Sequence, residues 1–254
     1  MDSVWDRFDF KGVLCFTGYP DRAKRCEEEF ARVGLGGVEV SWFAPNPYDS
    51  LLKGLVPLGG YMRRAAAAFN ITLHHLAVSK VFLERGARHA IIFEDDVRFL
   101  RDADLVREAI RTLPEDFDVA WLDLVPSEQG RRCPGFAESI ENARIDGVPL
   151  WRRARVWLRS CAAYALSRRA LEAYVDLLER GAKRRDELCV CDRHLAWLAD
   201  PSFGMTCYVS RPNVAVQALH GNHVSNTDND TQRDGYRILG IDRANYQHYE
   251  EDEP

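Results

Sequence analysis

Three consecutive carboxylates follow an apolar run, because Glu94, Asp95 and Asp96 come directly after Ala90-Ile91-Ile92-Phe93. The apolar run predicts a strand buried on both faces, as in the interior of a parallel sheet. Acids that share a buried site raise one another's pKa unless a cation neutralises them, and a hard divalent cation with oxygen ligands is the usual partner. Ligands of open α/β sheets bind at the carboxyl ends of strands. The stretch therefore predicts a site for a metal ion and the diphosphate of a nucleotide.

The three acids are expected to have different roles. Asp96 should bind Mn²⁺ or Mg²⁺ directly, and Glu94 should be the second ligand or bind through water. Asp95 should face the ribose or the sugar of a nucleotide sugar. As a Lewis acid, the ion would stabilise negative charge on the departing phosphate. An isolated acidic triplet is usually a solvated turn, but its position directly after a buried strand favours the metal site.

The elements before the triplet open with a β-α-β unit. Residues 10–17 are predicted as a strand and residues 38–43 as another, with a helix between them. Asp21 is the expected N-cap of this helix, and Gly34 should end it. The two strands should be parallel, with a right-handed crossover.

A long loop over residues 45–60 leads into a helix predicted over residues 62–84, which Gly86 ends. The helix should be largely buried because it carries two apolar stripes. One stripe consists of Leu73, Leu76, Ala77 and Val81, and the other of His75, Val78 and Phe82.

Strands and helices also alternate after the triplet, which predicts an α/β fold with a mostly parallel sheet flanked by helices. We assign residues 1–254 to a single domain, with residues 250–254 as a disordered acidic tail. The expected elements are a helix at 106–113, a strand at 117–123, an irregular insertion at 126–149, a strand at 161–166, a helix at 168–179 capped by Ser167, a helix at 190–198 and a strand at 206–210.

Composition narrows the classes of protein. The net charge of −5 argues against a nucleic-acid-coating protein, and 46% hydrophobic residues suffice for a folded core. Seven scattered cysteines indicate a reducing compartment, and the polar N-terminus has no signal-like apolar core. No apolar run reaches the ~20 residues of a membrane span. We expect a cytoplasmic protein without a transmembrane segment, and peripheral contact with a membrane stays open.

An ordered series of motifs resembles glycosyltransferase family 25, which includes lipopolysaccharide-biosynthesis and collagen galactosyltransferases. The similarity runs from about residue 10 to about residue 226, and each motif is weak alone. The motifs are Pro20-Asp21-Arg22, Leu73-His74-His75-Leu76, Glu84-Arg85-Gly86, Ala90 to Val97, Phe117 to Leu122, Cys161 to Ser167, Asp192-Arg193-His194-Leu195, and Arg211 to Gln217 with Ser225. The chain departs from the family pattern at His74, where the family has Ser, and at Thr17-Gly18-Tyr19.

The resemblance implies a GT-A fold, which is a Rossmann-like nucleotide-sugar-binding sheet with an acceptor half behind it. It implies a nucleotide-sugar donor, usually a UDP-hexose, a glycan or protein-glycan acceptor and an inverting mechanism. Inversion needs a general base that takes the proton of the acceptor hydroxyl. Asp192 is the first candidate, carried over from the Asp-x-x-Leu match, and an N-cap role is the alternative. Asp123, at the end of a predicted strand, is the second candidate.

The same resemblance suggests residues on the donor side. Thr17, Tyr19 and Arg22 flank the edge that meets the base and ribose in the GT-A arrangement. His75 would position the donor diphosphate or the acidic cluster, although a His on an apolar helix face is more often a core residue. Lys80, farther along the same helix, would reach a phosphate unless it is simply solvated. His223 is the preferred late histidine, over His220, for the metal shell.

Other functions fit less well. A non-catalytic nucleotide-sugar or carbohydrate-binding protein on the same fold is the main alternative. A metal-dependent phosphoesterase normally needs more dispersed ligands. Cys189, Cys191 and His194 suggest zinc, but their spacing is too tight for a Cys-x-x-Cys knuckle and no second pair follows. Buried free thiols are the better interpretation of these cysteines.

Overall fold

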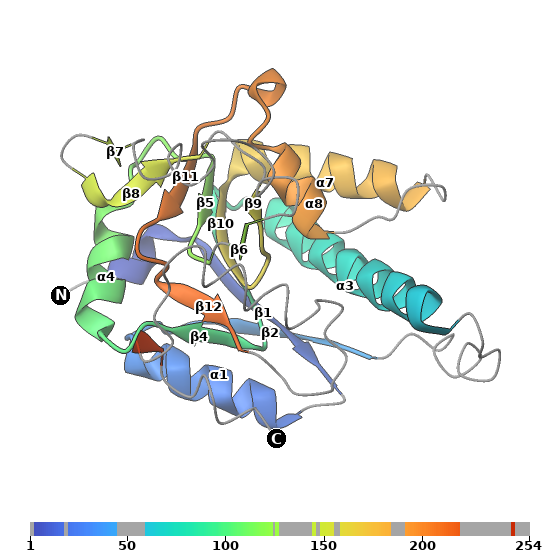
Figure 1. Ribbon diagram of the computed structural model, residues 1–254, viewed down its shortest axis with the longest axis horizontal. Coiled ribbons are helices and arrows are strands. Elements are labelled where there is room, and N and C mark those ends of the chain that lie inside the picture. The colour runs from blue at the N-terminus through green and yellow to red at the C-terminus, as the bar shows by residue number, and fades with distance from the viewer. Residues whose placement is uncertain are drawn as a thin grey trace.

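The computed structural model describes residues 3–17, 20–44, 59–123, 125–126, 144–145, 148–154, 158–183, 191–218 and 245–246 (Figure 1). The helices are η1 (Val4–Arg7), α1 (Pro20–Arg32), α3 (Gly59–Glu84), α4 (Ala103–Thr112), α7 (Arg168–Lys183), α8 (Cys191–Trp197) and η3 (Pro201–Phe203). The strands are β1 (Phe10–Phe16), β2 (Glu39–Phe43), β3 (His89–Glu94), β4 (Val97–Phe99), β5 (Val119–Trp121), β6 (Val125–Pro126), β7 (Arg144–Ile145), β8 (Val148–Arg153), β9 (Leu158–Arg159), β10 (Ala163–Ser167), β11 (Cys207–Ser210) and β12 (Ala215–Gln217).

One eight-stranded sheet has the order β2-β1-β3-β10-β5-β11-β8-β7. The β2, β1 and β3 strands are parallel neighbours, and β11 is parallel to β5. The β10 strand is antiparallel to both β3 and β5, so those two strands also share a direction. Only β10 and β8 run against the other strands of this sheet. The predicted α/β fold with a mostly parallel sheet is confirmed, as is the parallel pairing of the first two strands.

Helices cover both faces of the sheet, and the side chains of the central strands alternate between two cores. Val13 and Ile91 point into the core that includes residues of η1, α1 and α4. Leu14 and Ile92, their sequence neighbours, point into the core that includes residues of α3, α7 and α8. This alternation is the two-residue period of strands, and Figure 1 shows α3, α7 and α8 grouped away from α1.

One glycine lets α3 lie close to the sheet. A β-carbon on Gly12, in β1, would lie 2.8 Å from Cζ of Phe82. The Phe82 side chain is buried, and its ring stacks on Phe10 at 5.1 Å between centroids. Because the ring is buried and stacked on Phe10, glycine is the residue that this approach of helix and strand requires.

Several sequence predictions were wrong. α1 begins at Pro20, so Asp21 lies in its first turn and is not the N-cap. Only one predicted stripe of α3 is buried, because Leu73 and Val81 are exposed. The segment predicted as an irregular insertion contributes β7 and the start of β8 to the main sheet.

Ser167 caps α7 as predicted, because its hydroxyl accepts a hydrogen bond from Ala170 N. The five cysteines that the structure describes are buried and not in disulfides, which confirms the prediction of a buried free thiol for Cys191. Among the described residues, no helix combines the length and apolar character needed to cross a membrane. The assignment to one domain stays a prediction, and residues 250–254 lie outside the described residues.

Candidate functional site

The carboxyl ends of β1, β3 and β5 meet the start of β10 at one edge of the sheet. Glu94 N donates a hydrogen bond to Ala162 O (3.0 Å), and Leu122 N donates one to Ala163 O (3.0 Å). Because the strands from β1 to β5 are neighbours at this edge, their terminal residues come together although they are far apart in sequence. The acidic triplet lies here: Glu94 ends β3, and Asp95 and Asp96 form the turn to β4.

Asp95 faces the end of β1 and the first turn of α1. Its carboxylate accepts hydrogen bonds from Phe16 N at 2.8 Å and from Arg22 at 3.2 Å. Burial and the neighbouring Asp96 charge raise the pKa of Asp95 to about 6, against the opposing effect of Arg22. Arg22, expected at the nucleotide edge, therefore lies at the acid triplet and neutralises part of its charge.

Asp96 faces β12. Its Oδ2 accepts a hydrogen bond from Gln217 Nε2 at 2.7 Å, and its backbone oxygen accepts one from Ala218 N. Its Oδ1 is buried and has no hydrogen-bond partner among the described residues. Burial raises the pKa of Asp96, against Arg22 and the Gln217 hydrogen bond. A buried carboxylate oxygen without a partner is costly, and a bound cation would remove that cost.

Glu94 faces α3, where it meets the fully buried His75. Glu94 Oε1 lies 3.1 Å from His75 Nε2, and His75 Nδ1 lies 2.7 Å from the Tyr164 hydroxyl. Burial raises the pKa of Glu94 to about 7, although His75 acts in the opposite direction. Burial lowers the pKa of His75, but Cys191 and Glu94 outweigh it and raise that pKa to about 10. His75 thus contacts the acidic cluster, which is one of the two positions expected for it.

The three carboxylates of the triplet face three different elements, and the described residues do not bring their oxygens together as one group of metal-ligating atoms. Each carboxylate has a raised pKa, and burial is the largest cause in all three. Asp95 has a cationic partner in Arg22, and Glu94 has one in His75 when that ring is protonated. Asp96 accepts a hydrogen bond from a neutral amide, and the charges of Arg22 and Arg98 act against the rise of its pKa. The oxygens of Asp96 and Glu94 are hard ligands, which suits Mg²⁺ or Mn²⁺.

The two candidate general bases lie in different surroundings. Asp192 is half-buried in the first turn of α8, a helix that starts at Cys191, so it is not the N-cap. Asp123 is fully buried, and its carboxylate accepts hydrogen bonds from Ser160 Oγ (2.6 Å) and Asn213 Nδ2 (3.3 Å). These bonds tie the end of β5 to two other segments. Asp123 therefore fixes the end of β5 in position. The catalytic role of either acid stays a prediction.

The remaining predicted site residues are spread out. Thr17 is exposed at the end of β1, where its N–H donates to Phe43 O at 2.8 Å. Lys80 forms an ion pair with Glu179 of α7, so α3 directs it toward that helix. Tyr19 and His223 lie outside the described residues, as does Cys189.

Sequence reasoning missed the partners of the acids. Tyr164 and Gln217 were recognised only as parts of motifs, and neither was predicted to contact the acids. Sequence reasoning also dismissed Cys191, which lies in a buried group with His75 and Cys161. Within this group the Cys161 thiol, and then His75, hold the pKa of Cys191 well below its usual range. No local spacing could have revealed this group, because it joins residues from three separate segments.

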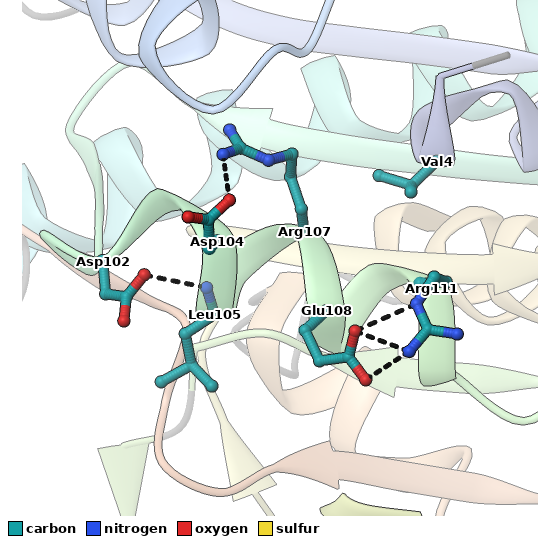
Figure 2. A pocket seen from close by; sticks show the side chains of 7 residues that line it. All are labelled: Val4, Asp102, Asp104, Leu105, Arg107, Glu108 and Arg111. Carbon is teal, nitrogen blue, oxygen red and sulfur yellow. Dashed lines mark hydrogen bonds and ion pairs between the residues drawn. The ribbon is translucent and has the colours of Figure 1, made fainter. Parts of the chain in front are cut away.

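A surface hollow on α4 lies apart from these residues. It is lined by Val4, Leu105 and several charged side chains. Most of these charged side chains form ion pairs within α4, as Figure 2 shows for Arg107 with Asp104 and Arg111 with Glu108. None of the predicted site residues lines it. Exposed pairs of this kind are ordinary features of a helix surface, so the hollow indicates no function.

Comparisons with known proteins leave the family open. No family model matches the chain, and no curated protein matches it. Among solved structures, the chain is similar to mannose-1-phosphate geranyltransferase from Thermus thermophilus, with 12% identity and a TM-score of 0.32 over 79% of this chain and 73% of that one. A likeness this weak does not extend to function. The resemblance to glycosyltransferase family 25 rests on the sequence motifs alone.

Proposed function

We propose that the protein is a metal-dependent glycosyltransferase. It would move a hexose from a nucleotide sugar, with a UDP-hexose as the expected donor, to a hydroxyl of a glycan or protein-glycan acceptor. The observation that supports this most is the Asp96 carboxylate. It is buried, it stands beside two further carboxylates, and its Oδ1 has no hydrogen-bond partner among the described residues.

Asp96 and Glu94 are the proposed protein ligands of Mn²⁺ or Mg²⁺, and His223 is the proposed later ligand. When bound, such an ion acts as a Lewis acid that stabilises negative charge on a departing diphosphate. His75 holds Glu94 in place through the 3.1 Å contact of Nε2, and Gln217 holds Asp96 through Oδ2. These contacts orient the two carboxylates before any ligand arrives, which is what a preorganised site needs.

The nucleoside of the donor is proposed to lie against the end of β1. Asp95 is fixed there by Phe16 N and Arg22, and Thr17 is exposed beside it. The proposed contacts to the base, ribose or sugar come from Thr17, Tyr19, Arg22 and Asp95. Lys80 is retained as a candidate phosphate contact, although it pairs with Glu179 in this structure.

Proton transfer is assigned to the acceptor side. Asp192 would take the proton of the acceptor hydroxyl while that oxygen attacks C1 of the sugar, opposite the departing diphosphate. The residue is half-buried in the first turn of α8, and its Oδ1 is buried. Asp123 is the second candidate, but its carboxylate already accepts two hydrogen bonds.

A panel of nucleotide sugars tests this function. Purified protein should hydrolyse or transfer from one of them with Mn²⁺ and lose that activity with a chelator. Asp96→Ala should abolish turnover while the protein stays folded by circular dichroism. Stabilisation by a nucleotide sugar without turnover would instead identify a binding protein. Full activity of Asp96→Ala would remove the metal assignment.

A further inference from the structure

A second cluster of ligating side chains lies behind the carboxylates. It brings together His75 from the middle of α3, Cys161 just before β10 and Cys191 at the start of α8. One ligating atom from each residue lies within 4.8 Å of those of the other two, and all three residues are buried. Their sequence separations exclude any local motif, so the fold itself assembles the group.

The atoms offered are two sulfurs and one imidazole nitrogen, a ligand set that suits Zn²⁺ and not the hard cations of an all-oxygen site. Zinc binds sulfur and nitrogen at about 2.0–2.3 Å, so tetrahedral ligands lie roughly 3.3–3.8 Å from one another. The cluster already holds its atoms within 4.8 Å. The ligating atoms therefore have to approach one another by no more than about 1.5 Å to reach the tetrahedral spacing.

The surroundings hold these ligands in place. The two ring nitrogens of His75 have fixed neighbours, Tyr164 at 2.7 Å and Glu94 at 3.1 Å. Whichever nitrogen binds a metal, the other keeps an oriented hydrogen bond, as ligating histidines normally do. Cys191 is fixed through its backbone, whose N–H donates to Thr72 Oγ1 (3.0 Å) and whose oxygen accepts from Tyr174 (3.2 Å).

We propose that His75, Cys161 and Cys191 bind a Zn²⁺ ion that joins α3, the start of β10 and α8. The thiol protons, and any proton on the coordinating imidazole nitrogen, leave to solvent when the metal binds. The two thiolates then balance the charge of the ion. The fourth position is open to water. The site shares His75 with the proposed donor site, where His75 contacts Glu94, but its soft ligands suit a structural role that does not require glycosyl transfer.

Metal content of the reduced protein tests the proposal. The full chain is purified with a phosphine reductant, exposed to Zn²⁺, freed of loosely held metal by gel filtration and analysed by mass spectrometry for bound metals. We expect one zinc ion per chain for the wild type. Cys161→Ser and Cys191→Ser should each lose most of it. Cys207→Ser is the matched control that should keep it, because Cys207 is equally buried but lies outside the cluster.

Cobalt replaces zinc as an optical probe and needs no variant. Co²⁺ added to the wild type should produce thiolate-to-metal charge-transfer absorption and the strong visible bands of a tetrahedral site, and Zn²⁺ should abolish both. Asp96→Asn should retain this spectrum, which separates the cluster from the carboxylate site. Wild-type protein without bound zinc and without thiolate–cobalt absorption would overturn the proposal. So would a Cys161–Cys191 disulfide in peptide maps of protein kept under reductant.

Discussion

Replacement of Asp96 by Asn tests whether Asp96 is a metal ligand or an acid that only stabilises the fold. In the metal-free protein, the Asn oxygen can still accept from Gln217, and the amide nitrogen takes the place of the Oδ1 that has no partner among the described residues. A charge that burial penalises is thus exchanged for a neutral amide, and the favourable effect of Arg22 and Arg98 on that charge is lost with it. We expect the free energy of unfolding of metal-free Asp96→Asn to stay within about 1 kcal/mol of the wild type. Loss of one partner from a buried ion pair would cost about 3–5 kcal/mol.

Bound metal should make the wild type more stable than Asp96→Asn, although the metal-free proteins are expected to have similar free energies of unfolding. At a Mn²⁺ concentration of about 100 times the dissociation constant, binding stabilises the folded state by about 2.7 kcal/mol. For a chain of this size, each kcal/mol raises the melting temperature by about 2–4 °C. The wild type should therefore gain roughly 5–11 °C with saturating Mn²⁺. Asp96→Asn should gain almost nothing.

The assay is thermal and urea unfolding of both proteins, with Mn²⁺ and with chelator. Asp95→Asn is the matched control, because Asp95 accepts from Phe16 N and pairs with Arg22. It should keep the full Mn²⁺ shift, because Asp95 is not a proposed metal ligand. The reasoning fails if metal-free Asp96→Asn loses as much stability as the loss of one partner from a buried ion pair, about 3–5 kcal/mol, or if it keeps the full Mn²⁺ shift.

Three further predictions concern packing, proton transfer and pH. Gly12→Ala should lower the free energy of unfolding by about 1–3 kcal/mol, because the new β-carbon would contact Phe82. Gly36→Ala is the control: its β-carbon would have no neighbour within 4 Å, so urea unfolding should not change. Asp192→Asn should lower kcat by about 10²–10⁴-fold at an unchanged melting temperature, and equal activity to wild type would exclude it as the base. The raised pKa of Glu94 means that the folded chain holds a proton that the unfolded chain releases, so metal-free stability should fall as pH rises from 4.5 to about 7. Urea midpoints at stepped pH should show this slope flattened in Glu94→Gln, and an identical slope in both proteins would contradict the shift.

Local patterns predicted the elements that carry the acidic triplet. Ile91, Ile92 and Phe93 form a continuous apolar run because both faces of β3 are covered, and that run alone locates a central strand. The position of Glu94 to Asp96 at its carboxyl end follows directly. The helical spacing of buried residues in α1 and the glycine that ends it are equally local signals.

The elements and contacts that the sequence did not predict depend on pairing between distant segments. β8 contains Pro149 and two arginines, so its sequence lacks the pattern of a buried strand. Its Trp151 is nevertheless fully buried and donates a hydrogen bond to Ala109 O. β12 is short, and it is recognisable only through its pairing with β4. The environment of each acid depends on such pairings, because β12 supplies Gln217 and α3 supplies His75. The triplet could therefore be located from sequence, but the separate partners of its three carboxylates could not.

The most direct test of the metal and diphosphate assignment is a crystal structure of the full chain with Mn²⁺ and UDP, with anomalous data collected near the manganese edge. We predict an anomalous peak bonded to the Asp96 carboxylate and to oxygens of the diphosphate, with the nucleoside toward the end of β1. A nucleotide bound elsewhere, or a manganese peak that the carboxylates of Glu94 and Asp96 do not contact, would contradict the account.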